Sequence, residues 1–160
     1  MDFIPINFTN KLHNNIIYNL AYKNNFYSNE IFYLLYENLD NNCYGYFVKS
    51  YSYKKIIGFI IYDIDKLQFK SHLLFLLVDS IYQNKGVGTK LVQKYIEDIE
   101  HHFLHIHYAE VDIKNDTLTK FYSKFGFSKY YSFIICSNNN LIYIPKKSLF
   151  HILLHKKSSL

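Results

Sequence analysis

Two spacings of apolar residues alternate along the 160-residue chain, and they predict both helices and strands. In some segments an apolar residue recurs every three or four positions, as in an amphipathic helix, and elsewhere the residues alternate or form short apolar runs, as in strands. Helices are predicted over residues 10–22, 29–36, 87–99 and 116–124. Strands are predicted over residues 3–8, 44–51, 55–64, 72–78, 108–113, 130–136 and 141–144. The pattern therefore predicts a fold that contains both helices and strands, of the α/β class in the broad sense and α+β in the narrower one.

Local signals predict where several elements begin and end. Thr9 is the expected N-cap of the first helix and Asn115 that of the last. A hairpin is predicted with its turn at residues 137–140, a run of Ser and Asn. Residues 1–147 are expected to form a single domain, since a chain of this length suits one core. Residues 148–160 are expected to be a short tail with apolar residues at helical spacing.

The segment from Val78 to Leu91 carries the strongest chemical signal in the chain. An apolar strand runs into a loop of the form Q-x-x-G-x-G, and an amphipathic helix follows directly. Because glycine has no Cβ, the backbone N–H groups of Gly86 and Gly88 can approach a ligand closely. The start of the helix adds N–H donors and the positive end of the helix dipole. The arrangement predicts an anion cradle, for which a diphosphate is the natural occupant.

The spacing of this loop differs from the dinucleotide fingerprint G-x-G-x-x-G and from the P-loop G-x-x-x-x-G-K-[ST]. It resembles the Y-[RQ]-x-x-G-[IV]-G loop of the GNAT superfamily of acetyl-CoA-dependent N-acetyltransferases. Residues 110–115 and 121–127 resemble the second signature of that family, E-V-x-x-x-N followed by F-Y-x-K-x-G-F. The resemblance covers nearly the whole chain and is greatest to NatE-type and bacterial ribosomal-protein alanine N-terminal acetyltransferases.

The resemblance implies a fold and a cosubstrate. A GNAT fold is a mixed, mostly antiparallel seven-stranded sheet flanked by four helices. Its fourth and fifth strands splay apart, and the pantetheine arm of acetyl-CoA lies in the gap. The chemistry uses acetyl-CoA and needs no metal, so the histidines at 101, 102, 105 and 107 are not expected to form a metal site.

By the same resemblance, three groups of residues would hold acetyl-CoA. Backbone groups that bind the pantetheine amides and the thioester oxygen would belong to Leu76, Leu77 and Val78. The diphosphate would lie on the loop formed by Gln83, Asn84, Lys85, Gly86, Val87, Gly88 and Thr89. The pantetheine and the thiol would be bordered by Asn115, Tyr122 and Lys124.

Glu110 and Tyr122 are the expected catalytic base and acid. Glu110 takes the position at which the bacterial relatives carry a catalytic glutamate, and a positioned base contributes about 10²–10⁴-fold to a rate. The alternative for Glu110 is a surface carboxylate or a salt-bridge partner, and Asp112 is a second candidate base. The tyrosine of F-Y-x-K-x-G-F points its hydroxyl at the departing sulfur, which implies that role for Tyr122. The alternative for Tyr122 is a core tyrosine with a satisfied hydroxyl.

His72 is the third catalytic candidate, and there the chain departs from the NatE-type relatives. Those enzymes carry a catalytic Tyr at the position of His72 and a His at the position of Glu110. A His–Glu pair across the splayed strands can relay a proton, since His titrates near neutrality. The alternative is a histidine at the end of a strand with no catalytic task.

Charge and composition narrow the class of partner and the compartment. The net charge of +5 suits a phosphate-bearing ligand, whereas the lysines form no run of the kind that binds nucleic acid. Cys43 and Cys136 make neither a disulfide framework nor a zinc motif. No secretory signal or membrane-length apolar run is present, so a cytoplasmic or nuclear protein without a membrane partner is expected.

The acceptor remains open at this point. A protein N-terminal α-amine is the first choice, with an auxiliary protein subunit as an additional partner. A small-molecule amine, such as the amino-sugar phosphate glucosamine 6-phosphate, is the second. A non-catalytic GNAT module that binds a partner is the third, and the intact phosphate loop argues against it.

Overall fold

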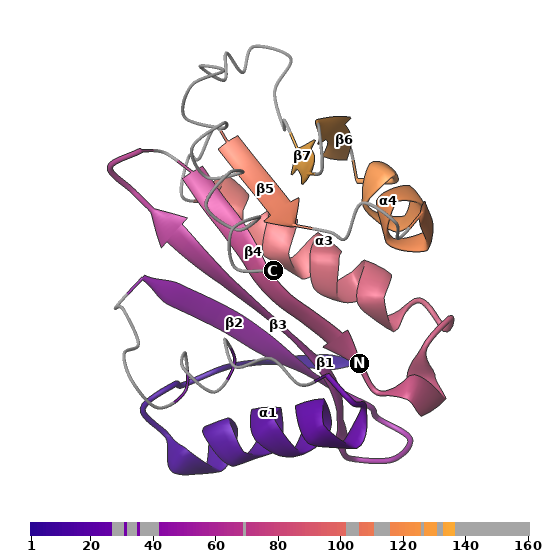
Figure 1. The fold of residues 1–160 in the computed structure, drawn as a ribbon. Coiled ribbons are helices and arrows are strands. Elements are labelled where there is room, and N and C mark those ends of the chain that lie inside the picture. Colours follow the sequence, from indigo (N-terminus) through magenta and orange to yellow (C-terminus); the bar gives the residue numbers. More distant parts are fainter. Residues whose placement is uncertain are drawn as a thin grey trace.

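Seven strands form one mixed sheet in the computed structural model, which describes residues 1–26, 31, 35, 42–68, 70–101, 106–110, 116–125, 127–130 and 133–136. The order across the sheet is β1-β2-β3-β4-β5-β7-β6 (Figure 1). The strands are β1 (Asp2–Pro5), β2 (Cys43–Lys49), β3 (Ile56–Asp65), β4 (Lys70–Val78), β5 (Ile106–Glu110), β6 (Phe127–Tyr130) and β7 (Phe133–Cys136). Neighbouring strands are antiparallel except β4 and β5, which are parallel. The mixed, mostly antiparallel sheet expected from the sequence is confirmed.

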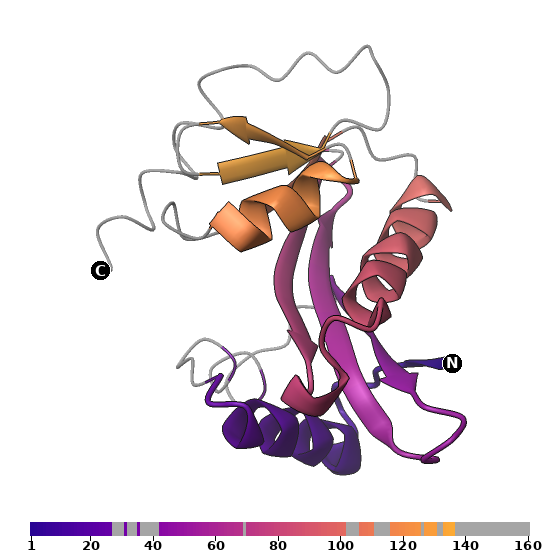
Figure 2. The same ribbon diagram turned by 90° about the vertical axis from the view of Figure 1, so that its right-hand side faces the viewer.

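Helices cover the two faces of this sheet. Helix α1 (Lys11–Lys23) lies against one face and α3 (Val87–His101) against the other (Figure 2). The short η1 (Ser80–Tyr82) follows β4, and α4 (Asp116–Ser123) lies beside β6 and β7. Each face has its own apolar cluster, so β3 is apolar on both sides: alternate residues pack toward α1 (Phe59, Ile61) and toward α3 (Ile60, Tyr62). Burial on both faces explains the unbroken apolar run of this strand.

A β-bulge interrupts β4 at Leu74. Ile61 of β3 pairs with Phe75 and the next residue, Tyr62, pairs with Leu73, so Leu74 is the extra residue. Leu74 and Phe75 both pack in the apolar cluster on the α1 face, although successive residues of a regular strand alternate. A bulge bends its strand and increases the local twist. The parallel pairing with β5 ends at the same place, because Leu73 with Ala109 is its last pair.

Buried tyrosines hold α3 against the sheet. Tyr62 of β3 donates a short hydrogen bond to Asp98 of α3, and Tyr46 of β2 donates to the other carboxylate oxygen at 3.1 Å. The hydroxyls of Ser71 in β4 and Tyr95 in α3 form a further hydrogen bond at 2.6 Å. Burial, followed by the contact with Asp98, raises the pKa of Tyr62 above its ordinary value, so this phenol stays neutral. These bonds fix the helix whose N-terminus ends the glycine loop.

Two predicted boundaries near the start of the chain are corrected. The side chain that caps α1 is Asn10, whose Oδ1 accepts from the N–H of Leu12 at 2.9 Å, and not Thr9. Asn caps a helix at least as well as Thr, and here it stands directly before the first helical residue. Strand β1 ends at Pro5 and not at residue 8.

The single strand predicted over residues 130–136 is wrong, because the structure has two strands there, β6 and β7. The hairpin predicted with its turn at residues 137–140 lies outside the described residues. Strands β6 and β7 pair with Tyr130 opposite Phe133. The residues from Tyr130 to Ile135 are aromatic or β-branched apart from Ser132, so the sequence there resembles a continuous strand. Most of the helix predicted over 29–36, the strand predicted over 141–144 and the tail 148–160 lie outside the described residues.

Candidate functional site

Strand β4 continues beyond the end of β5. After the last parallel pair, β5 ends at Glu110, whereas β4 runs on to Val78 (Figure 1). Among the described residues, no strand pairs with residues 74–78 on the β5 side, while β3 pairs with residues 75–78 on the other. Within the described residues, the backbone groups of this half of β4 that point away from β3 have no strand partner and are available to a ligand, apart from the carbonyl of Val78, which accepts a hydrogen bond from Gln83. This is the splay expected between the fourth and fifth strands.

A tight turn joins β4 to α3. Asp79 caps η1, and its Oδ1 accepts a hydrogen bond from the N–H of Ile81 at 3.4 Å. Asn84 and Gly86 then have positive φ angles of 59° and 77°. Asn tolerates this left-handed region better than most residues, and glycine adopts it without strain. The two left-handed residues turn the backbone so that α3 can begin at Val87.

The turn leaves a run of backbone donors unused. The first hydrogen bond at the start of α3 runs from the N–H of Lys90 to the carbonyl of Gly86 at 3.1 Å. In the part of the chain that the structure describes, the N–H groups of residues 84–89 have no acceptor. Consecutive unpaired N–H groups at the start of a helix attract an anion through hydrogen bonds and the helix dipole. Residues 84–89 are called the cradle below.

The two glycines of the cradle have different surroundings. A Cβ on Gly86 would have no heavy atom within 4 Å, so the cradle is open to a ligand at this residue. A Cβ on Gly88 would contact the ring of Phe121 at 3.5 Å and the side chain of Val78 at 3.7 Å. Phe121 of α4 thus lies close over the first turn of α3. It places α4 next to the cradle and to the end of β4.

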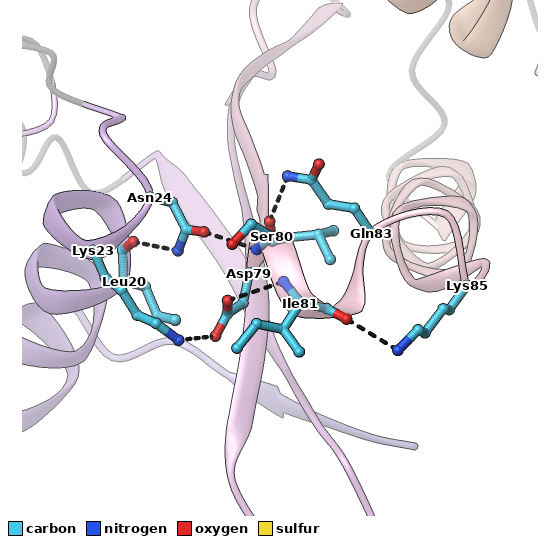
Figure 3. A network of polar contacts seen from close by, with 9 residues as sticks. Leu20, Lys23, Asn24, Asp79, Ser80, Ile81, Gln83 and Lys85 are labelled. Atoms are coloured by element: carbon cyan, nitrogen blue, oxygen red, sulfur yellow. Dashed lines mark hydrogen bonds and ion pairs between the residues drawn. The ribbon is translucent and has the colours of Figure 1, made fainter.

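Side chains near the cradle bind the backbone of the turn (Figure 3). The Nε2 of Gln83 donates to the carbonyl of Val78 at 3.0 Å, and the ammonium of Lys85 donates to the carbonyl of Ile81 at 3.0 Å. The same ammonium lies 5.5 Å from the centre of the Tyr82 ring. In this arrangement the donors of the cradle are backbone groups, and the side chains of Gln83 and Lys85 shape the turn.

Asp79 is the buried charge of this region. It is 2% exposed, and its Oδ2 forms an ion pair of 2.6 Å with Lys23 of α1. Burial opposes ionisation of Asp79. The hydrogen bonds from Lys23 and Ile81 and the positive charges of Lys23 and Lys55 outweigh this effect, so the pKa of the carboxyl lies below its ordinary value. The carboxylate therefore remains charged at neutral pH.

Tyr122 lies on α4 with its ring in the apolar cluster on the α3 face. The side chain is 5% exposed, and its ring centre lies 5.1 Å from that of Phe121 and 5.4 Å from that of Phe127. Within the described ranges its hydroxyl has no hydrogen-bond partner. Burial raises the pKa of this phenol above its ordinary value, so it keeps its proton at neutral pH.

The other predicted site residues lie in different places. Glu110 is the last residue of β5 and pairs with Phe133 of β7, so its backbone lies where β4 and β5 part. His72 is buried and pairs with Tyr108 in the part of β4 that precedes the splay, so it does not lie across the gap. Lys124 is exposed just after α4. Asp112 and Asn115 lie outside the described residues.

Comparison with known proteins identifies the family. The sequence matches the model of the Acetyltransferase (GNAT) family over residues 15–127. The chain belongs to the GNAT acetyltransferase family. It is therefore an N-acetyltransferase by class. A comparison with curated proteins gave no sequence match.

Solved GNAT structures share the fold at low sequence identity. The ribosomal-protein-S18-alanine N-acetyltransferase from Escherichia coli is 16% identical with a TM-score of 0.67, covering 89% of this chain and 100% of its own. A spermidine N-acetyltransferase variant from Vibrio cholerae is 15% identical with a TM-score of 0.68, covering 86% and 95%. A GNAT acetyltransferase from Elizabethkingia anophelis, solved with acetyl-CoA bound, is 18% identical with a TM-score of 0.64, covering 81% and 76%.

The site of this GNAT protein fits the cosubstrate of its family. GNAT acetyltransferases use acetyl-CoA, whose diphosphate needs several donors and whose pantetheine arm needs unpaired backbone. The unpaired N–H groups of the cradle and the unpaired half of β4 are adjacent and meet both needs. No group of three or more His, Cys, Asp or Glu side chains in the described part of the chain is arranged to hold a metal ion. None of its described helices is long and apolar enough to cross a membrane.

Sequence reasoning missed several residues that shape the site. Lys23 and Asn24 contact the turn after β4 from the end of α1, and Asp79 and Ser80 receive these contacts. Phe121 lies over the cradle, although the sequence identifies it only as part of a motif. For Phe121 the motif F-Y-x-K-x-G-F is a signal in the sequence from which its place near the site could have been predicted. For Lys23 and Asn24 the sequence contains no such signal, because 56 residues separate each of them from its partner.

Proposed function

We propose that this protein transfers the acetyl group of acetyl-CoA to the α-amine of a protein N-terminus. The observation that carries the proposal is the position of the cradle, whose unpaired N–H groups adjoin the unpaired half of β4. When bound, acetyl-CoA supplies the acetyl thioester. The cradle would hold its diphosphate, and the backbone of Leu76, Leu77 and Val78 would orient its pantetheine arm and thioester. A preorganised backbone donor at a developing oxyanion contributes about 3–4 kcal/mol.

Two side chains would move the protons. Glu110, at the end of β5, would take the proton that the attacking amine loses, directly or through a water molecule. Tyr122 would give its proton to the sulfur as the C–S bond breaks and the C–N bond forms. The proton accepted by Glu110 then leaves to solvent, and the phenol is reprotonated, so the products are the amide and free CoA. The raised pKa of Tyr122 supports its role, since the hydroxyl is a donor throughout the neutral range.

Apolar side chains on the α1 face of β4 favour a peptide acceptor. Leu74, Phe75 and Leu77 pack on this face beside the unpaired half of the strand. Phe26, which is 37% exposed, lies with its ring 6.3 Å from that of Phe75. Such surroundings suit the first side chain of a peptide better than a phosphate or a polycation, whose charges would lose their hydration there.

A small-molecule amine is the second candidate acceptor. It is favoured by the fold, because the spermidine N-acetyltransferase is as similar to this chain as the alanine N-acetyltransferase. An assay that measures the release of CoA distinguishes the two candidate acceptors. It uses a panel of peptides, polyamines and amino-sugar phosphates, and the acetylated product is identified by its mass. We expect turnover with peptides that have a free N-terminus and none with N-terminally blocked peptides. Turnover confined to the small amines would overturn the proposed acceptor.

Glu110→Gln should lower turnover at neutral pH at least about tenfold while leaving CoA binding unchanged, because it removes a base and no contact to CoA. The rise of kcat/KM with pH, measured with a confirmed acceptor, should lose the limb that belongs to this carboxylate. Glu100→Gln, an exposed change on α3, is the matched control and should behave like the wild type. An unaltered pH–rate profile in Glu110→Gln would remove Glu110 from the mechanism, and His72 and Asp112 would be replaced next.

A further inference from the structure

The end of α1 and the start of the turn after β4 are joined by two polar contacts. Lys23 donates to the Oδ2 of Asp79 at 2.6 Å, and the N–H of Ser80 donates to the Oδ1 of Asn24 at 2.8 Å (Figure 3). Helix α1 lies on the opposite face of the sheet from α3, which carries the second half of the cradle. These contacts therefore connect the α1 layer of the domain to the segment that leads into the cradle.

Asp79 forms hydrogen bonds with residues of several elements. Its N–H donates to the carbonyl of Ile57 in β3 at 2.9 Å, and its carbonyl accepts from the N–H of Tyr82 at 2.7 Å. Its carboxylate receives the ammonium of Lys23 and the N–H of Ile81. A buried carboxylate is tolerated only where such partners neutralise and bond it. The side chain of Asp79 thus fixes the first residues of the turn to both β3 and α1.

Asn24 is held equally firmly on the α1 side. Its Nδ2 donates to the carbonyl of Leu20 at 2.8 Å, and its backbone N–H caps the helix through Leu20 and Ala21, each at 3.2 Å. With the donor end of the amide bound to α1, the acceptor end is directed at Ser80 (Figure 3). The chain then leaves the helix through Asn25, whose φ is 55°.

The cradle itself has few other supports. Its backbone N–H groups make no hydrogen bonds within the described residues, so its place depends on the segments at its two ends. At the α3 end, Val87 is buried in the apolar cluster on the α3 face. At the β4 end, the side-chain hydrogen bonds that reach the turn from a distant element of the chain come from Lys23 and Asn24. The ring of Tyr82 is also contacted by the ring of Tyr53, at 5.6 Å between centres, and by the ammonium of Lys55, at 5.2 Å.

We propose that Lys23 and Asn24, acting through Asp79 and Ser80, are positioning residues that set the affinity of the cradle for CoA. This inference rests on the proposed function of the cradle. If the contacts hold the turn in register with the unpaired half of β4, their loss displaces the N–H donors from the diphosphate. Small displacements of binding groups are sufficient to weaken a ligand or a reaction strongly. A merely structural role would lower the stability of the fold and leave the affinity of the folded protein unchanged.

The test compares Lys23→Met, Asp79→Asn and the double variant, with the dissociation constant of CoA from calorimetry and the melting temperature measured for each. We expect Lys23→Met to weaken CoA binding about tenfold, because it leaves the buried carboxylate without its ion pair. The double variant should recover most of this loss, since the uncharged amide that replaces the carboxylate would still accept the N–H of Ile81. Glu97→Gln is the control, because it breaks the exposed pair of Lys94 with Glu97, whose atoms are 4.0 Å apart.

Two results would overturn the inference. In the first, Lys23→Met melts earlier than the wild type but binds CoA equally well. In the second, the wild-type protein does not bind CoA, and hydrogen exchange of residues 79–82 is the same in the wild type and in Lys23→Met. Failure of the wild type to bind CoA would by itself refute the proposed function, whereas faster exchange in Lys23→Met would still support the positioning role.

Discussion

Replacing Gly86 by Asp should weaken the binding of CoA at least about a hundredfold, or about 2.7 kcal/mol. A Cβ at Gly86 points into space that no other atom of the structure occupies within 4 Å, so the fold has room for the new side chain. That space adjoins the N–H groups expected to bind the diphosphate. A carboxylate there would repel the ligand and compete for the same donors. Calorimetric titration with CoA measures the change.

Gly86→Asn is the matched control for this variant. It places a side chain of nearly the same size at the same φ of 77° and carries no charge. Both variants share the strain of a non-glycine residue in the left-handed region, which Asn and Asp bear better than others. The Asn variant should therefore lose much less affinity than the Asp variant. Equal affinities in the two variants would mean that the diphosphate does not lie on the cradle.

Tyr122→Phe should reduce kcat about a hundredfold with little change in KM. The ring remains, so its packing against Phe121 and Phe127 survives and only the hydroxyl is lost. The interaction with the sulfur grows as the C–S bond breaks, so its loss affects the transition state more than the bound substrate. Steady-state rates with a confirmed amine acceptor measure the effect. Tyr53→Phe, an exposed change, is the control.

The pH dependence gives a second test of Tyr122. Its pKa is raised by burial, so the phenol stays protonated well beyond neutral pH and is lost as a donor only above the ordinary tyrosine value of about 10. The wild-type rate should therefore show no alkaline decline from this group below about pH 10. A decline at lower pH that disappears in Tyr122→Phe would contradict the raised pKa. A wild-type rate in Tyr122→Phe would show that water or another residue is the acid.

The parts of the fold that local chemistry determines are predictable from the sequence. The loop between Gln83 and Thr89 is indicated by two glycines that follow an apolar strand and precede an amphipathic helix, and the structure has this arrangement. The strand at 72–78 is recognisable from its apolar run and is part of β4. In each case a few adjacent residues carry the signal, because the backbone conformation and burial they require are local.

The features that the sequence does not reveal depend on contacts between distant residues. The bulge at Leu74 is a matter of register between two strands, and both Leu73 and Leu74 are apolar, so no change of residue type marks it. The contact of Lys23 with Asp79 joins residues far apart in the chain, and an exposed lysine at the end of a helix is common. The division of residues 127–136 into β6 and β7 escapes prediction because the residue types there favour a continuous strand.

The proposed cofactor site is made of main-chain atoms, and this has a consequence for how the protein can evolve. Every amino acid except proline supplies an N–H group, so most residues of the cradle can be exchanged without removing a donor. The geometric requirements of the loop are then mainly the glycine with its positive φ and the small residue beneath Phe121. Drift elsewhere in the loop is tolerated, which fits a domain that keeps its fold at 15–18% identity to the solved structures compared above.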